Sequence, residues 1–198
     1  MSMPHKTALL VIDAQKIYTD KASELYCPDS RGTIRRINEL IEKFEKKRLP
    51  IFFIRHIHKK NGSDLGRMFD YMGEAATEFN FKEGSAEVEY DEGLYLPKKR
   101  VEIKKRRYSS FVGTGLNAKL KKLNVDTVAI TGFMTNFCCE SAARDAHDRD
   151  YFVDFVLDAT GTPGTQAMNE KQVRKAVGDF VGLGFARISE TKEFIKRL

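Results

Sequence analysis

The sequence lacks tryptophan and contains only three cysteines among its 198 residues. Because an odd number of cysteines cannot all pair, and because the neighbours Cys138 and Cys139 rarely bridge each other, we expect reduced thiols rather than a disulfide framework. Long apolar runs are also missing. None approaches the roughly 20 residues that span a bilayer, and the run over residues 7–12 is too short for the core of a secretion signal. These absences predict a cytoplasmic protein without a membrane segment.

Tracts rich in proline, serine and glycine, which would mark a linker or a disordered tail, are absent as well. Hydrophobic residues make up 41% and charged residues 31%, a globular balance, and the length favours a single domain over residues 1–198. The formal net charge is +6, and residues 98–107 are densely basic. An acidic segment precedes this basic stretch, and apolar residues alternate within it, so we expect an ordinary strand and no nucleic-acid partner.

Apolar runs alternate along the chain with segments of helical spacing. We expect strands over residues 7–12, 51–56, 101–105, 127–131, 151–158 and 185–188, and helices over 34–44, 116–123, 141–150 and 166–183. This order predicts the α/β class, with a three-layer α/β/α, Rossmann-like fold and a six-stranded, mostly parallel sheet. The less regular segment 59–97 is expected to be an excursion that folds over the edge of the sheet or contributes to a lid or an oligomer contact.

Three reactive side chains fall where strands end. Asp13 follows the first strand, Lys105 closes the third, and Cys138 follows the fourth at the expected start of a helix. Ligands of open α/β sheets bind beyond these carboxyl ends. A carboxylate can accept a thiol proton, while an ammonium and a helix N-terminus both favour the thiolate, so Cys138 is expected to be largely or readily deprotonated near neutral pH. Taken singly, Asp13 could be a cap, Lys105 a surface charge and Cys138 a core residue.

Three segments carry a resemblance to a known family. They are ALLVIDAQ (8–15), KRRYSSFVGTGL (105–116) and TGFMTNFCCESAARDA (131–146). In this order they resemble the signature segments of the isochorismatase-like cysteine hydrolases, a superfamily that includes nicotinamidases, N-carbamoylsarcosine amidases and ureidoacrylate or biuret amidohydrolases. The resemblance implies a hydrolase without a cofactor, with Asp13, Lys105 and Cys138 as catalytic residues, and a homo-oligomer, either dimer or tetramer. Lys104 is expected on the opposite face of its strand.

The resemblance also implies an oxyanion hole and a reaction. A cis peptide bond between Phe133 and Met134 would turn the Met134 N–H toward the reacting carbonyl, beside the Cys138 N–H. The expected reaction is cleavage of a small amide or carbamoyl C–N bond through a thioester. Residues that flank the catalytic segments are candidates to line the substrate pocket, with core packing as the alternative for the aromatic ones. They are Gln15, Tyr18, Phe111, Phe133 and Phe137.

The histidines His56 and His58 raise the question of a metal. Nicotinamidases of this superfamily hold a metal with an Asp-x-His pair and a later histidine, whereas His56 stands here where the acid would be. We therefore expect no metal, with a shared Zn²⁺ as the alternative. The segment 55–68 is more similar to ureidoacrylate and biuret amidohydrolases. Two other functions stay open, a vinyl ether hydrolase, which Cys138 disfavours, and a non-catalytic protein that binds a partner through its basic strand.

Overall fold

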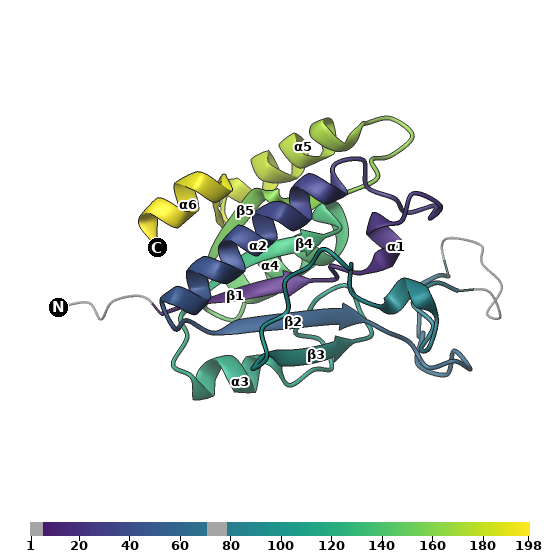
Figure 1. The fold of residues 1–198 in the computed structure, drawn as a ribbon, viewed down its shortest axis with the longest axis horizontal. Coiled ribbons are helices and arrows are strands. Elements are labelled where there is room, and N and C mark those ends of the chain that lie inside the picture. The colour runs from purple at the N-terminus through teal and green to yellow at the C-terminus, as the bar shows by residue number, and fades with distance from the viewer. Residues whose placement is uncertain (1–5, 71–78) are drawn as a thin grey trace.

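The computed structural model describes residues 6–70 and 79–198, in which strands and helices alternate for most of the chain (Figure 1). The strands are β1 (Thr7–Ile12), β2 (Ile51–His56), β3 (Val101–Lys105), β4 (Thr127–Phe133), β5 (Phe152–Gly161) and β6 (Arg187–Ser189). The helices are α1 (Lys16–Thr19), α2 (Ser30–Lys46), α3 (Leu116–Lys122), α4 (Glu140–His147), α5 (Glu170–Gly182) and α6 (Thr191–Arg197), with the short helical turns η1 (Ala86–Val88) and η2 (Thr135–Cys139).

The described strands form one sheet in the order β3-β2-β1-β4-β5-β6, and every neighbouring pair is parallel. This confirms the predicted six-stranded, Rossmann-like sheet. After β3 at one edge, the chain returns to the far side of β1 as β4. The connections that follow β1 and β4 therefore lead away in opposite directions at the switch point of the topology, where α/β sheets leave room for a ligand.

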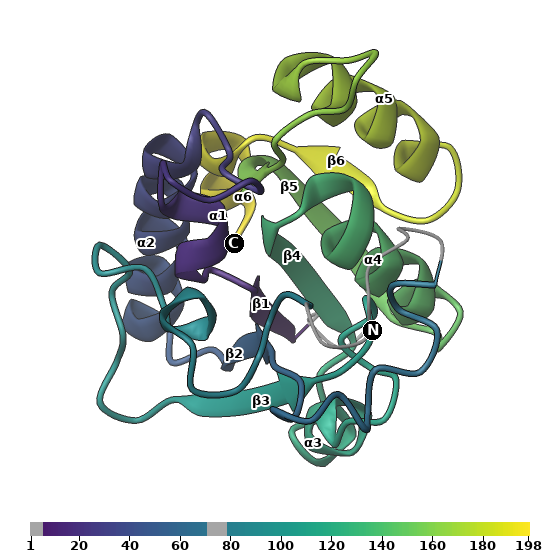
Figure 2. The ribbon, with the colours of Figure 1, turned by 90° about the vertical axis from the view of Figure 1, so that its right-hand side faces the viewer.

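Helices cover both faces of the sheet, which makes the expected three layers (Figure 2). Side chains of β1 alternate between the two layers, as the period of a strand requires. Leu9 and Val11 belong to the core shared with α1, α2 and α6, whereas Leu10 and Ile12 belong to the core shared with α3, α4 and α5. All six residues of β1 are buried, which explains the continuous apolar run that predicted this strand.

Several elements differ from the prediction. The short elements α1, η1 and α6 were not expected, because they are too short to show a clear period. The fifth helix begins at Glu170 instead of residue 166, since the side chains of Asn169 and Gln172 each accept a hydrogen bond from the other's backbone N–H and form a capping box. Strand β5 continues to Gly161, beyond the predicted end at residue 158. None of the described helices has the length and apolar character needed to cross a membrane.

The excursion over 59–97 joins the sheet beside the ends of β1 and β2. Residues 71–78 of it lie outside the described part of the chain. Isolated bridges pair Gln15 with Tyr90 and His58 with Lys82. The excursion therefore lies next to the carboxyl edge of the sheet, and its role as a lid or an oligomer contact stays a prediction.

Gly132 permits the close approach of β4 to β1 at the switch point. Its φ is +117°, and a Cβ added there would lie 1.8 Å from the backbone oxygen of Ile12, its partner across the sheet. We expect Gly132→Ala to lower the free energy of unfolding by about 3 kcal/mol or more, because the clash is with backbone and the conformation disfavours any L side chain. Urea unfolding would measure it. Gly184→Ala is the control, since no atom lies within 4 Å of an added Cβ there, and an equal effect of the two substitutions would contradict this account.

Candidate active site

The ends of four neighbouring strands supply the polar side chains at the switch point. Asp13 directly follows β1, His56 and Lys105 are the last residues of β2 and β3, and Cys138 lies in η2, which follows β4. Parallel strands place these ends at one edge of the sheet, so residues far apart in the chain meet there. Cys138 was expected at the start of a helix, and η2 is a single π-type turn that leads directly into α4.

Lys105 lies between the other two members of the predicted trio. Its Nζ is 2.8 Å from Asp13 Oδ2 and 3.1 Å from Cys138 Sγ, and it also donates a hydrogen bond to the Arg107 carbonyl oxygen. All three trio side chains are buried, with 0–1% of each residue exposed. Lys104, by contrast, is exposed and pairs with Glu83, as the alternation of β3 predicts. The structure thus brings together the three residues that the sequence singled out.

The backbone around Asp13 fixes the direction of its carboxylate. Asp13 has a φ of +50°, its N–H donates to the Ile54 carbonyl at 2.8 Å, and its carbonyl accepts from the Gln15 N–H at 2.7 Å. The Gln15 side chain accepts from the His56 N–H and donates to the carbonyls of His56 and Val88. Gln15, which we expected in the substrate pocket, therefore uses its amide to join the ends of β1 and β2 to η1.

Burial prevails in the ionisation of Asp13 and Cys138, but not in that of Lys105. It raises the pKa of Asp13 despite the opposing charge of Lys105, and it raises the pKa of the Cys138 thiol to about 12. For Lys105, burial opposes the charged form, but Asp13 and Cys138 outweigh it and raise the pKa, so the ammonium persists. One buried cation can balance only one buried anion. Asp13 and Cys138 therefore share one proton between them at neutral pH.

The sequence predicted that Cys138 is largely or readily deprotonated near neutral pH. Burial opposes the thiolate, because a fully buried sulfur loses the water that would stabilise its charge, so the raised pKa favours the thiol in the resting site. The same burial raises the pKa of Cys139 well above its usual value. The two cysteines differ instead in their partners, because Lys105 Nζ contacts the sulfur of Cys138.

The segment between β4 and α4 has the backbone conformation that the resemblance implied. The peptide bond between Phe133 and Met134 is cis. The Met134 carbonyl accepts hydrogen bonds from the N–H groups of Phe137 at 3.2 Å and Cys139 at 3.1 Å, which closes the η2 turn around Cys138. The roles of the Met134 and Cys138 N–H groups as an oxyanion hole stay a prediction.

The aromatic residues predicted for the pocket occupy different environments. Tyr18 and Phe133 are buried and stack on each other, with ring centroids 5.5 Å apart. Phe111 is buried in the core cluster that also contains Cys138. Phe137 is 37% exposed and contacts Tyr108. Phe81, which the sequence analysis did not select, lies between Tyr18 and His56, with its ring 4.4 Å from that of His56.

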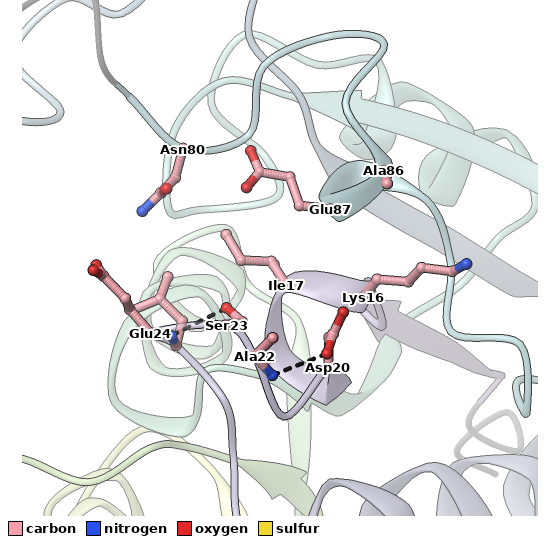
Figure 3. A pocket seen from close by; sticks show the side chains of 10 residues that line it. Lys16, Ile17, Asp20, Ala22, Ser23, Glu24, Asn80, Ala86 and Glu87 are labelled. Carbon is pink, nitrogen blue, oxygen red and sulfur yellow. Dashed lines mark hydrogen bonds between the residues drawn. The ribbon is translucent and has the colours of Figure 1, made fainter.

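A separate cavity of ≈ 380 Å³ lies beside α1 and η1 (Figure 3). Its lining includes Lys16, Asp20 and Glu87 and none of the trio. Figure 3 shows Ile17 of α1 facing this space, and Ile17 precedes Tyr18, which belongs to the aromatic stack near the trio.

Three side chains near Lys105 carry atoms that could bind a metal ion. Asp13, His56 and Cys138 each offer an atom within 4.8 Å of the others. However, Lys105 Nζ already contacts both Asp13 and Cys138, and its raised pKa keeps it charged. A divalent cation among these atoms would meet an ammonium at close range. The residues present do not fit a resident metal, so no step of the reaction is derived through one.

Comparisons with known proteins agree with the geometry. The family model of the isochorismatase domain matches residues 7–191. Nicotinamidase 3 of Arabidopsis thaliana is 31% identical over 155 residues, which are 78% of this chain and 73% of that protein. Ureidoacrylate amidohydrolase RutB of Methylorubrum extorquens is 39% identical over 72 residues, which are 36% of this chain and 29% of that protein.

Solved structures share the whole fold. The structure of a cysteine hydrolase from Pseudomonas syringae pv. phaseolicola is similar with a TM-score of 0.90 and 27% identity, covering 100% of this chain and 98% of that one. N-carbamoylsarcosine amidase from Thermoplasma acidophilum has a TM-score of 0.75 at 21% identity, covering 94% and 96%, which shows the fold alone. Fold and family together define a hydrolase of the three-layer α/β/α class. The chain belongs to the isochorismatase domain family, and amidases are among its relatives.

Proposed function

We propose that this protein is a cysteine-dependent hydrolase that cleaves a small amide or carbamoyl C–N bond through a thioester, with Asp13, Lys105 and Cys138 as catalytic residues. The observation that carries the proposal is the position of Lys105, whose Nζ contacts the carboxylate of Asp13 and the sulfur of Cys138 in a buried site. Burying these charged groups carries a large desolvation cost, which their mutual attraction only partly offsets. A catalytic role explains why the protein keeps such a costly arrangement. It supports nucleophilic catalysis over the alternative of a non-catalytic binding protein.

The mechanism begins with the proton that Asp13 and Cys138 share. Asp13 takes the thiol proton, and Lys105 stabilises the resulting thiolate. The sulfur attacks the substrate carbonyl carbon, and the π electron pair moves to the oxygen, which accepts hydrogen bonds from the N–H groups of Met134 and Cys138. When the C–N bond breaks, the nitrogen takes the proton from Asp13 and leaves as an amine or ammonia.

Hydrolysis of the thioester uses the same groups, with Asp13 as the base for a water molecule and Cys138 as the leaving group. Asp13, again a carboxylate, removes a proton from a water molecule, whose oxygen attacks the thioester carbonyl. The tetrahedral intermediate collapses, the C–S bond breaks, and the sulfur leaves as a thiolate beside Lys105. The proton on Asp13 then returns to Cys138, and the acid product departs.

The burial of the nucleophile and the relatives support the proposed substrate class. A fully buried nucleophile suits a small molecule, and the names of the relatives include a nicotinamidase and a ureidoacrylate amidohydrolase, both of which act on C–N bonds. Cys138 disfavours a vinyl ether substrate, because thioester chemistry needs an acyl carbon. We keep as predictions a homo-oligomer, a cytoplasmic location and the absence of a nucleic-acid partner.

Ammonia release from a substrate panel tests the proposal. The panel contains nicotinamide, ureidoacrylate, biuret, N-carbamoyl amino acids and simple aliphatic amides. We expect turnover of at least one of them, and we expect it to survive exhaustive EDTA treatment because the Lys105 ammonium lies among the available donor atoms. Loss of turnover with EDTA and recovery with Zn²⁺ would overturn the metal-free mechanism. Absence of turnover across the panel would contradict the amide class.

A further inference from the structure

A buried chain of polar side chains leads from the excursion to the trio. His56 Nε2 lies 3.0 Å from His58 Nε2, and His58 Nδ1 lies 3.4 Å from Asp64 Oδ1. Both histidines are fully buried, and the ring of His56 stacks on Phe81. The proposed mechanism assigns no part to any of these residues.

Asp64 is held as a carboxylate at the outer end of the chain. Its oxygens accept from the Lys59 N–H, and Oδ2 also contacts the guanidinium of Arg106. Although partial burial opposes the charge, these partners hold the pKa of Asp64 below its usual value. Burial lowers the pKa of His58 and lowers that of His56 further, so both rings are neutral.

The charge of the Asp64 carboxylate favours one tautomer in both rings, although His58 Nδ1 makes no hydrogen bond to it in the structure. A negative oxygen 3.4 Å from His58 Nδ1 favours a proton on that nitrogen over a lone pair, so His58 Nε2 carries the lone pair. Two lone pairs cannot face each other at 3.0 Å without repulsion. His56 Nε2 therefore carries a proton that it donates to His58, and His56 Nδ1 is left as an acceptor.

His56 lies beside the trio, and its Nδ1 has no hydrogen-bond partner among the described residues. This nitrogen is also buried. One ring nitrogen of His56 lies within 4.8 Å of an Asp13 carboxylate oxygen and of the Cys138 sulfur, and Nε2 is already engaged with His58. A buried polar atom without a partner is costly, and such atoms are often satisfied by a ligand.

We infer that His56 Nδ1 is a specificity-determining acceptor that binds an N–H of the substrate's amide or carbamoyl nitrogen, and that the Asp64–His58 pair holds it in the accepting tautomer. This inference rests on the proposed function, since it concerns the bond that Cys138 attacks. An ester with the same acyl group has no N–H to offer and would leave Nδ1 unpaired. His56 would thus favour amides over esters.

A matched pair of substrates tests this selectivity. The best amide of the panel and the methyl ester of the same acid give the same thioester, so their kcat/KM values compare acylation alone. His56→Phe keeps an aromatic ring against Phe81 and removes both nitrogens. We expect the ratio of amide to ester kcat/KM to fall about 10- to 100-fold, with the ester value nearly unchanged. His147→Phe, at an exposed histidine, is the control and should leave the ratio at the wild-type value.

The outcomes separate the two proposals. If His56→Phe lowers amide and ester turnover equally, His56 is structural and the inference fails while the proposed function stands. If the wild-type protein hydrolyses neither substrate, the proposed function fails. In that case the protonation of the histidine ring nitrogens, which can be measured without any substrate, still tests whether His56 Nδ1 is an acceptor.

Long-range ¹H–¹⁵N correlation spectra of the histidine rings report each tautomer at neutral pH. We expect a proton on Nε2 of His56 and on Nδ1 of His58, and a proton on His56 Nδ1 would overturn the inference. Asp64→Asn should reverse both tautomers, because the amide oxygen would face Arg106 and its NH₂ would donate to His58. The same variant should lower the amide-to-ester ratio as His56→Phe does. Asp70→Asn, a partly exposed carboxylate paired with Arg67, is the control that should change neither measurement.

Discussion

Replacing Cys138 by alanine is expected to lower kcat for the best panel substrate by roughly three orders of magnitude or more. The sulfur is the nucleophile of the proposed mechanism, and among the described residues no other thiol is a partner of Lys105 Nζ. Without it, catalysis through a thioester is lost, and binding and the oxyanion hole alone would contribute the residual rate. Ammonia release under substrate saturation would measure the loss.

The neighbouring cysteine offers a matched control. Cys139 is as deeply buried as Cys138 and belongs to the same core cluster, so Cys139→Ala removes an equal volume from the core. We expect it to cost about 1 kcal/mol of stability and to leave turnover within a few-fold of wild type. Hydroxylamine added during turnover should yield a hydroxamic acid with the wild-type protein and none with Cys138→Ala. Near-normal turnover of Cys138→Ala would refute the cysteine mechanism.

Lys105→Met is expected to abolish most activity and also to destabilise the protein. Removing the ammonium leaves Asp13 buried beside Cys138 with no cation, and breaking a buried pair in this way costs about 3–5 kcal/mol. We expect kcat to fall at least about 100-fold, because the thiolate loses its counter-charge. Unfolding in urea and ammonia release measure the two effects separately.

The pH dependence of stability gives the sign of the Asp13 contribution. Burial already raises the pKa of Asp13 above the model-compound value of 3.8, and loss of Lys105 removes the charge that opposes this shift. A raised carboxyl pKa contributes stability that is present below the unfolded-state pKa and is lost as the pH rises through the folded-state pKa. The stability deficit of Lys105→Met relative to wild type should therefore be small near pH 3 and should widen toward neutral pH.

Lys104 is the control for the lysine next to it in β3. Its side chain is 56% exposed, and its Nζ lies 3.3 Å from Glu83 Oε1. Surface ion pairs of this kind contribute little to stability. Lys104→Met should change stability by less than about 1 kcal/mol at any pH and leave turnover near wild type. If Lys104→Met and Lys105→Met behaved alike, the assignment of Lys105 as the buried partner of Asp13 would be wrong.

Sequence periodicity was sufficient for the framework of the fold. The apolar run over residues 7–12 marked a strand buried on both faces, and the alternation of β3 distinguished Lys105 from Lys104, because successive strand residues point to opposite faces. Parallel strands align their carboxyl ends, so residues at those ends can be expected to meet before any coordinates exist. Asp13, Lys105 and Cys138 were selected in this way.

Local pattern could not supply the interactions that depend on distant partners. Gln15 was expected in the pocket, yet its amide is bound to the backbone of His56 and Val88, 41 and 73 residues away. Asp64 lies in an irregular segment, where no periodicity or motif marks it as a partner of His58, although its carboxylate lies 3.4 Å from His58 Nδ1. Phe81 contacts Tyr18 and His56 only because the excursion brings it back to the ends of the strands, which local pattern does not reveal.

The protonation of the site was decided by tertiary structure alone. The sequence placed an ammonium and a helical turn near Cys138 and therefore suggested a thiolate, but pKa depends on how much water the fold removes, and complete burial raises the thiol pKa to about 12. By itself the sequence determined the order of strands and helices along the chain, the layer pattern and the identity of the reactive side chains, since these follow from local periodicity. Packing determined which atoms touch and which proton they share, because both depend on residues brought together from separate strands.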